Sequence, residues 1–214
     1  AVDLKPLGGK HIIVTSGGTR EQIDPIRVIT NLSSGKMGEN VARGCYIKGA
    51  KVSLVHSGKN IPYVDTYQVQ SAEEMIERVI NLSREADVLV SAAAISDYGM
   101  DPLKQKLRSG RESIQLELHR KPKLVDAVRK EFPDIVIVGF KAEIEEDQKI
   151  VIERSKELLE RVGLAFVVSN NARVMGLEDT EVKIIRMEEI IEVEGSKRVV
   201  GIKIAEELSK EIKT

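Results

Sequence analysis

The stretch that decides the fold runs from Gly17 to Gly38 and reads GGTREQIDPIRVITNLSSGKMG. It follows a short β-branched apolar run, Ile12 to Thr15, and leads into a helical pattern that begins near Met37. A turn between a strand and a helix normally takes only a few residues, so this one is about five times too long. A connection of that length in a compact domain is expected to carry function.

The polar residues of this loop predict a pocket for an anionic substrate. The pair Gly17-Gly18 lets a ligand approach the backbone, and Arg27 and Asn31 supply hydrogen-bond donors. The run from Ser33 to Lys36 stands at a helix N-terminus, where anions bind. A simpler interpretation is also open, in which the glycines form a tight strand exit and the serines cap the helix.

Two standard phosphate-binding motifs are not met here. A dinucleotide fingerprint needs G-x-G-x-x-G, but the next glycine after Gly18 is Gly35. A phosphate loop would need glycine at Thr30 and serine or threonine at Met37. The loop therefore belongs to another class.

The segments from Thr19 to Arg27 and from Thr30 to Gly38 resemble the signature of phosphopantothenoylcysteine synthetase, also called phosphopantothenate:cysteine ligase, of coenzyme A biosynthesis. The resemblance covers nearly the whole chain from Gly9 onward. It implies that 4′-phosphopantothenate and L-cysteine are joined through an acyl-cytidylate, with CTP as co-substrate and Mg²⁺ as cofactor. In many prokaryotes this enzyme is fused to a flavin-dependent decarboxylase, from which the present chain could have been excised.

The resemblance also assigns roles within the loop. It implies that Asn31 holds the acyl-nucleotide intermediate. We expect Arg27 and Asn31 to bind the acyl substrate, and Gly18, Ser34 and Lys36 to bind the nucleotide.

Composition limits the alternatives. The 214 residues are 42% hydrophobic, which suits one large domain, and we assign residues 10–214 to it and residues 1–9 to a linker or cut end. The 33 basic and 34 acidic residues nearly cancel, which argues against nucleic acid as a partner. With no signal peptide and no apolar run of about 18 residues, we expect a cytoplasmic protein without membrane contact. The single cysteine, Cys45, is expected in the core.

Strand and helix patterns alternate along the rest of the chain, which predicts an α/β fold: a Rossmann-like, mostly parallel sheet flanked by helices. Strands are predicted at 51–56, 67–69, 88–91, 135–139, 164–169 and 181–187. Helices are predicted at 37–48, after Ser71, at 145–162 and at 200–212, with a turn at 194–196.

The strand at 88–91 leads into a second candidate loop, from Ala92 to Tyr98, at the carboxyl edge of the sheet, where open α/β folds place ligands. We expect Ser91, Ala92 and Ala93 to lie against the nucleotide, because small side chains let a flat ring or a phosphate approach the backbone. Asp97 is a candidate Mg²⁺ ligand, or else a simple turn cap.

Between Asp101 and Arg120 the pattern becomes exposed and predicts a flap or hairpin excursion. Its basic residues suit a solvated edge strand, but the resemblance implies that Lys106 contacts the nucleotide phosphates, with Lys104 as the fallback. The alternating Ile114, Leu116 and Leu118 predict a homodimer, as does the family's use of a neighbouring subunit in each active site.

Two later segments are similar to family motifs near the nucleotide. They imply contacts from Pro122, Lys123, Leu124 and Val125, although lysines here replace the family's asparagine and aspartate, and from Phe140, which could instead be a core residue.

The family also usually has two triphosphate-binding lysines in the helix at 145–162. In this sequence those positions are occupied by Leu158 and Val162, so the role of the two lysines cannot be assigned to them. The nearby basic residues are Lys156 and Arg161.

The three histidines, His11, His56 and His119, are scattered, and we find no nucleophile or metal cluster in the sequence. Activation of a carboxylate by a nucleotide needs cationic groups, magnesium and positioning rather than a nucleophile, and Asn31 and Lys106 are the predicted catalytic residues. Two other functions stay open: a non-catalytic nucleotide-binding module, and an NAD(P)-dependent reductase, which the missing glycine fingerprint disfavours.

Overall fold

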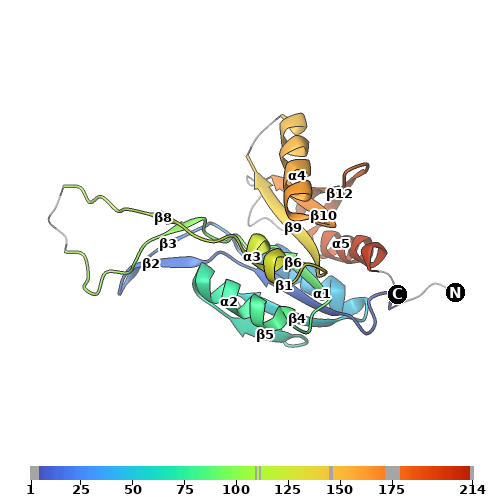
Figure 1. Cartoon of the computed structure of the whole chain (residues 1–214), viewed down its shortest axis with the longest axis horizontal. Coiled ribbons are helices and arrows are strands. Elements are labelled where there is room, and N and C mark those ends of the chain that lie inside the picture. The colour runs from blue at the N-terminus through green and yellow to red at the C-terminus, as the bar shows by residue number, and fades with distance from the viewer. Residues whose placement is uncertain (1–4, 109, 111, 145–146, 172–178, 213–214) are drawn as a thin grey trace.

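A mixed sheet forms the centre of the computed structural model, which describes residues 5–108, 110, 112–144, 147–171 and 179–212 (Figure 1). It has eight strands in the order β12-β11-β10-β9-β6-β1-β4-β5. The six neighbouring strands β10, β9, β6, β1, β4 and β5 pair in parallel. Strand β11 pairs antiparallel with both β10 and β12. The bounds are β1 His11–Ser16, β4 Lys51–His56, β5 Asp65–Gln68, β6 Val88–Ser91, β9 Val136–Glu143, β10 Phe166–Asn171, β11 Asp179–Ile185 and β12 Ile190–Ser196. The predicted α/β class and Rossmann-like sheet are confirmed.

Helices cover both faces of this sheet. On one face α1 (Lys36–Ile47) packs against α5 (Lys197–Glu211), and on the other lie α2 (Ala72–Ser83), α3 (Leu124–Glu131) and α4 (Gln148–Val162). Neighbouring residues of β1 enter different cores, since Ile12 and Val14 contact the first set and Ile13 the second. A strand that is buried on both faces has a mostly apolar sequence. Strands β1, β4 and β6 could be predicted from the sequence for this reason.

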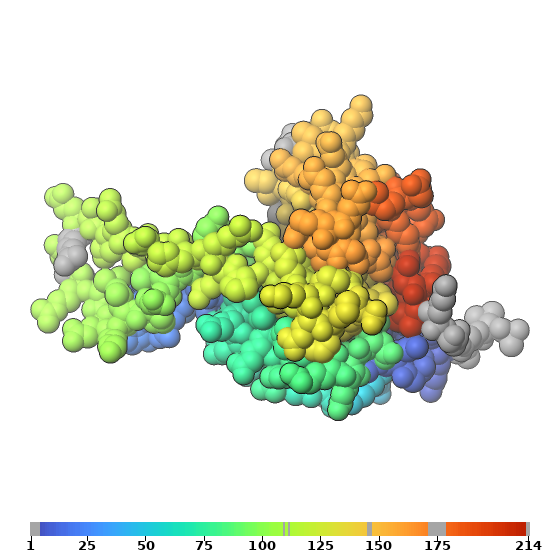
Figure 2. Space-filling model, viewed as in Figure 1, coloured from blue at the N-terminus to red at the C-terminus, as the bar shows by residue number. Residues whose placement is uncertain are grey.

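An arm projects from one side of the body (Figures 1 and 2). It consists of the hairpin of β2 (Arg20–Asp24) and β3 (Arg27–Thr30), together with the described residues between Asp101 and Leu118. The short strands β7 (Tyr98–Gly99) and β8 (His119–Arg120) pair where the chain leaves and rejoins the body. The predicted excursion is therefore present.

Asp24 anchors the arm. Its buried carboxylate accepts from the backbone N–H of Leu107 at 3.0 Å and of Ile26 at 2.9 Å, and it also pairs with the Arg27 guanidinium. Burial raises the pKa of this carboxyl, but these hydrogen bonds and the arginine charge outweigh burial and lower it to about 2. The carboxylate thus joins the hairpin to the 101–108 segment.

Several sequence expectations need correction. The stretch between Gly17 and Gly38 is not a continuous loop, because it contains the β2–β3 hairpin. Residues 194–196 do not form a turn but end strand β12, and Ser196 caps α5 by accepting from the Val199 N–H at 3.4 Å. Between Asp101 and Leu118 the described residues form no regular strand, and residue 109 of the expected Ser-Gly turn lies outside them.

The remaining boundaries differ by a few residues. Helix α4 begins at Gln148, and residues 145–146 of the predicted helix lie outside the described part. Of the expected linker, Leu7 is fully buried in the core, so this part packs against the domain. Cys45 is a core residue as predicted, and burial raises the pKa of its thiol to about 12. In the described residues no helix has the length and apolarity needed to cross a bilayer.

Candidate active site

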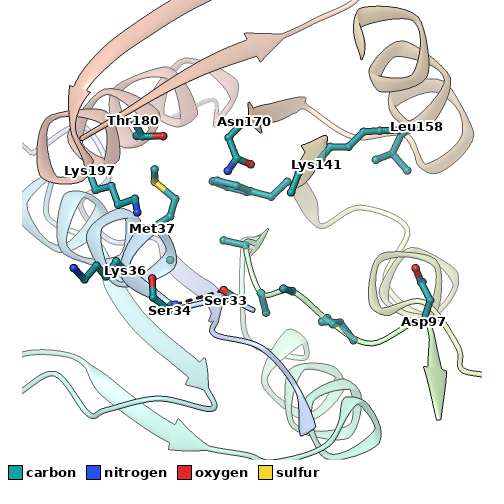
Figure 3. A pocket seen from close by; sticks show the side chains of 18 of the residues that line it. Ser33, Ser34, Lys36, Met37, Asp97, Lys141, Leu158, Asn170, Thr180 and Lys197 are labelled. Atoms are coloured by element: carbon teal, nitrogen blue, oxygen red, sulfur yellow. Dashed lines mark hydrogen bonds between the residues drawn. The ribbon is translucent and has the colours of Figure 1, made fainter. Parts of the chain in front are cut away.

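A pocket of about 420 Å³ opens at the carboxyl edge of the parallel strands (Figure 3). Loops that are far apart in the sequence form it, which is the usual ligand position in an open α/β sheet. The lining residues are Ser33, Ser34, Gly35, Lys36, Met37 and Gly38 after the hairpin; Ala92, Ala93, Ala94, Ile95 and Asp97 after β6; and Lys123, Phe140, Lys141, Ala142, Leu158, Asn170, Thr180 and Lys197.

The N-terminus of α1 is held against the end of β1. Gly35 has a φ of 76°, in the left-handed region that favours glycine, and its carbonyl accepts from the Ser16 hydroxyl at 2.7 Å. A Cβ at Gly38 would lie 2.7 Å from the Ser16 Cβ, so this close approach needs a second glycine. The first backbone N–H groups of α1 have no partner within the helix and lie beside the pocket.

The expected serine cap is absent. The N-cap of α1 is Gly35, which has no side chain to accept from the first turn, and Ser33 instead accepts from the Gly35 N–H at 3.4 Å. Ser34 therefore lines the pocket without serving as the helix cap.

Backbone contacts fix the two main loops to each other. The Ala94 carbonyl accepts from the Asn31 side-chain amide at 3.1 Å and from the Thr19 N–H at 3.3 Å, and the Ala94 N–H donates to Gly17 at 2.8 Å. A Cβ at Gly18 would meet the Asn31 carbonyl oxygen at 2.6 Å, so the close contact of these two segments explains that glycine. Asn31 thus stands beside the pocket, bonded to one of its lining residues.

The described part of the chain contains no cluster of three or more metal-ligating side chains. Asp97 lies in the pocket with its carboxylate 61% exposed, and the Lys123 ammonium is 3.9 Å away. Mg²⁺ is commonly held by one or two carboxylates together with substrate phosphates, so this single carboxylate fits a metal that arrives with a nucleotide.

Residues 7–213 match the family described as DNA/pantothenate metabolism flavoprotein, C-terminal domain. The chain belongs to this family. It is 37% identical over 210 residues to the coenzyme A biosynthesis bifunctional protein CoaBC of Methanocaldococcus jannaschii, of which the match covers 52%, and 96% of this chain takes part. The chain therefore spans about half the length of that relative.

Two solved structures share the fold of this pantothenate-metabolism domain. The C-terminal domain of a coenzyme A biosynthesis bifunctional protein CoaBC is 30% identical, with a TM-score of 0.78 and 97% of both chains covered. A Cab2 mutant in complex with phosphopantothenate-cysteine superposes with a TM-score of 0.77 at 16% identity, covering 94% of this chain and 87% of the other, which shows a common fold.

The structure of this family member brings many of the predicted site residues together. Ser34, Lys36, Ala92, Ala93, Asp97, Lys123 and Phe140 all line the pocket. Gly18, Asn31, Ser91 and Pro122 are neighbours of lining residues in sequence or by contact, but they are not part of the wall. Phe140 lines the pocket and also packs against the core.

Other predicted residues lie elsewhere. Leu124 is 2% exposed and Val125 packs beside it, so these two residues of α3 belong to the core and do not line the pocket. Arg27 pairs with Asp24, and Lys106 is an exposed residue of the arm, next to the anchored Leu107. Within one chain the structure does not bring Lys106 to the pocket wall.

Sequence reasoning missed Met37, Lys141, Asn170, Thr180 and Lys197 as lining residues. The expected position of the triphosphate lysines is apolar here, since Leu158 lines the pocket and Val162 is buried. Lys141 follows the predicted Phe140, and its ammonium lies 3.1 Å from Glu143. A lysine in the first turn of a helix, such as Lys197, carries no sequence signal that separates it from a solvated one.

Proposed function

We propose that this domain joins 4′-phosphopantothenate to L-cysteine in coenzyme A biosynthesis, with CTP as the activating nucleotide. The observation that supports this most directly is the nearly complete match to the C-terminal domain of CoaBC, combined with a pocket built from the same loops that carry the sequence resemblance. A protein of this fold, Cab2, has been determined with phosphopantothenate-cysteine, so such a sheet can hold the proposed product.

The proposed reaction has two steps. The phosphopantothenate carboxylate attacks the α-phosphorus of CTP and pyrophosphate leaves, which gives an acyl-cytidylate. The cysteine amine then attacks the acyl carbon and CMP leaves as the amide forms. No protein nucleophile is required, and the only cysteine, Cys45, is buried with a neutral thiol.

The pocket offers groups suited to these steps. Asp97 would hold Mg²⁺ through its carboxylate, and the metal would neutralise phosphate charge when bound. The amide of Asn31 can donate to an anionic oxygen while its own oxygen accepts a hydrogen bond, so it suits a phosphodiester intermediate. Phe140 and the backbone of Ala92 and Ala93 provide a flat apolar surface for the base.

We assign CTP rather than ATP because a pocket walled by the backbone of small residues can discriminate bases by size and hydrogen-bond pattern. The kcat/KM for CTP should exceed that for ATP. Comparable values for the two nucleotides would remove this assignment.

We also propose a homodimer in which Lys106 acts in the pocket of the neighbouring subunit. Ile114, Leu116 and Leu118 are exposed on the arm by 46%, 37% and 39%, and apolar side chains gathered on a projection mark a protein contact. Pairing two arms by C₂ symmetry would cover these apolar residues. It would also bring the Lys106 of each chain towards the pocket of the other chain.

Complementation of two inactive variants tests this arrangement. Asn31→Ala and Lys106→Ala chains are co-expressed with different tags, and the mixed dimer is purified. If Lys106 acts in the neighbouring pocket, one of the two sites in each mixed dimer is intact, and about half of the wild-type activity returns. If both residues act within one chain, every site carries one substitution and no activity returns.

Isotope transfer tests the reaction itself. Phosphopantothenate labelled with ¹⁸O in its carboxylate should pass one labelled oxygen to CMP during turnover. A non-catalytic nucleotide-binding module would give neither CMP nor amide product. A reductase would bind NADPH, and this binding would raise its Tm. We expect that NADPH does not bind this protein and leaves its Tm unchanged.

A further inference from the structure

Helices α1 and α5 begin at the same wall of the pocket. Lys36, Met37 and Gly38 of α1 line it, as does Lys197, the first residue of α5. The two helices approach closely further along, because a Cβ at Gly201 would lie only 2.4 Å from the Asn40 carbonyl oxygen. Both helices therefore direct their N-termini towards one side of the cavity (Figure 3).

The side chain of Lys197 adds a full charge to this wall. The residue is only 6% exposed, and Figure 3 shows its ammonium directed into the cavity beside Met37, whereas the Lys36 side chain extends away from it. Each helix N-terminus contributes roughly half a positive charge over its first turn. A charge held in a wall away from bulk water attracts an anion more strongly than a surface charge does.

The opposite part of the wall lacks such a group on α4. Leu158 is the lining residue there, and Val162 is 3% exposed. On the β9 side the Lys141 ammonium lies 3.1 Å from Glu143, and its side chain extends towards α4. The α1–α5 wall is where two helix N-termini and a buried lysine side chain directed into the cavity occur together.

We propose that Lys197 is a substrate-binding residue that holds a phosphate group against the N-termini of α1 and α5. This inference rests on the proposed function for the identity of the ligand: two of the three proposed substrates, CTP and 4′-phosphopantothenate, carry phosphate, and the chemistry they share is a phosphate oxyanion. The Lys197 ammonium donates a charge-assisted hydrogen bond to the phosphate. The backbone N–H groups in the first turns of α1 and α5 add partial positive charge beside the same phosphate.

Binding of inorganic tripolyphosphate, measured by calorimetry at low salt, tests the inference without requiring turnover. Lys197→Gln keeps a polar side chain of similar length but removes the charge, and it should raise the Kd by roughly 10- to 100-fold, the usual effect of losing a hydrogen bond to a charged group. Lys197→Arg retains the charge and should stay within a few-fold of the wild type.

The matched control is Arg198→Gln. It removes the same charge from the next residue of the same helix, which is exposed and outside the pocket wall. Its Kd should equal that of the wild type. Equal weakening by both glutamine variants would show a general field effect and overturn the assignment, as would an unchanged Kd for Lys197→Gln. Lys197→Met replaces the glutamine variant if the latter fails to fold.

Steady-state kinetics then identify which phosphate is held. A rise in KM for CTP with an unchanged KM for cysteine assigns Lys197 to the nucleotide, and a rise in KM for phosphopantothenate alone assigns it to the acyl substrate. A fall in kcat with every KM unchanged would overturn a binding role. If the protein binds tripolyphosphate through Lys197 but makes no amide, the proposed function fails while this inference stands.

Discussion

The close packing of α1 on α5 predicts that Gly201→Ala destabilises the protein. A Cβ at this position would lie 2.4 Å from the oxygen and 2.5 Å from the carbon of the Asn40 carbonyl, and 2.9 Å from the Val41 nitrogen. All three are backbone atoms of α1, so no side-chain rotation relieves the contact. Ordinary contact begins at 3.4 Å, so the nearest pair must separate by 3.4 − 2.4 = 1.0 Å.

The magnitude follows from two opposing effects. Forcing extra volume into a packed interface costs about 1–3 kcal/mol. Alanine in place of glycine inside a helix recovers up to about 1 kcal/mol. We expect a net loss of about 1–2 kcal/mol, which lowers the Tm by roughly 2–8 °C for a domain of this size. Because α5 carries Lys197, the same shift should also raise the Kd for tripolyphosphate.

Thermal unfolding at one fixed protein concentration measures this loss, since a dimer would make the Tm depend on concentration. The control is Gly58→Ala, where the nearest atom to the new Cβ is the Glu39 carboxylate oxygen at 3.8 Å, an ordinary contact. That variant should match the wild type within about 0.5 kcal/mol. A Gly201→Ala protein as stable as this control would refute the packing argument.

Three further predictions concern the loop and the arm. Asn31→Asp places a negative charge beside the phosphodiester and should lower the overall rate by at least about a hundredfold, while CTP binding persists; near-normal rates of both pyrophosphate release and amide formation would exclude Asn31 from the chemistry. Asp24 has its pKa lowered to about 2, so its stabilisation of the arm is fully present above about pH 4 and is lost as the pH falls through 2. Asp24→Ala should accordingly speed proteolysis within 101–108 several-fold at pH 7, and an unchanged cleavage rate would mean that the anchor is redundant. Leu116→Glu should convert a dimer to a monomer in light scattering, and a dimeric variant would place the interface elsewhere.

The central sheet could be predicted because its signal is local. Strands β1, β4 and β6 are short segments rich in Val, Ile and Leu that are buried on both faces, and their predicted bounds fall within one residue of the observed ones. Helix α2 was predicted from the capping box at Ser71, whose hydroxyl accepts from the Glu74 N–H at 3.2 Å. The Glu74 carboxylate reaches back one residue further than expected, to the Gln70 N–H at 2.8 Å.

The peripheral strands could not be found in the same way. Strand β2 has one apolar residue, Ile23, and its other buried residues, Glu21 and Asp24, are charged, so it has no apolar period to detect. In β12, Gly195 and Ser196 form a typical turn pair, yet the glycine ends a strand at a φ of 138° and the serine caps α5. Turn chemistry marks a break in the chain but does not distinguish a turn from a strand end that meets a helix.

The candidate site shows the same limit in a stronger form. The loops after β1 and β6 could be identified because their polar or small residues follow one another in sequence, and both loops line one pocket. Lys197 lies about a hundred residues or more from either loop, and it reaches the pocket because glycines at 44 and 201 let α5 lie against α1. Its position depends on the distance between two helices, a property of the packed fold. On α4, where the sequence resemblance implied lysines, the lining residue is Leu158, and the buried lysine that helix packing brings to the pocket, Lys197, lies on the opposite wall.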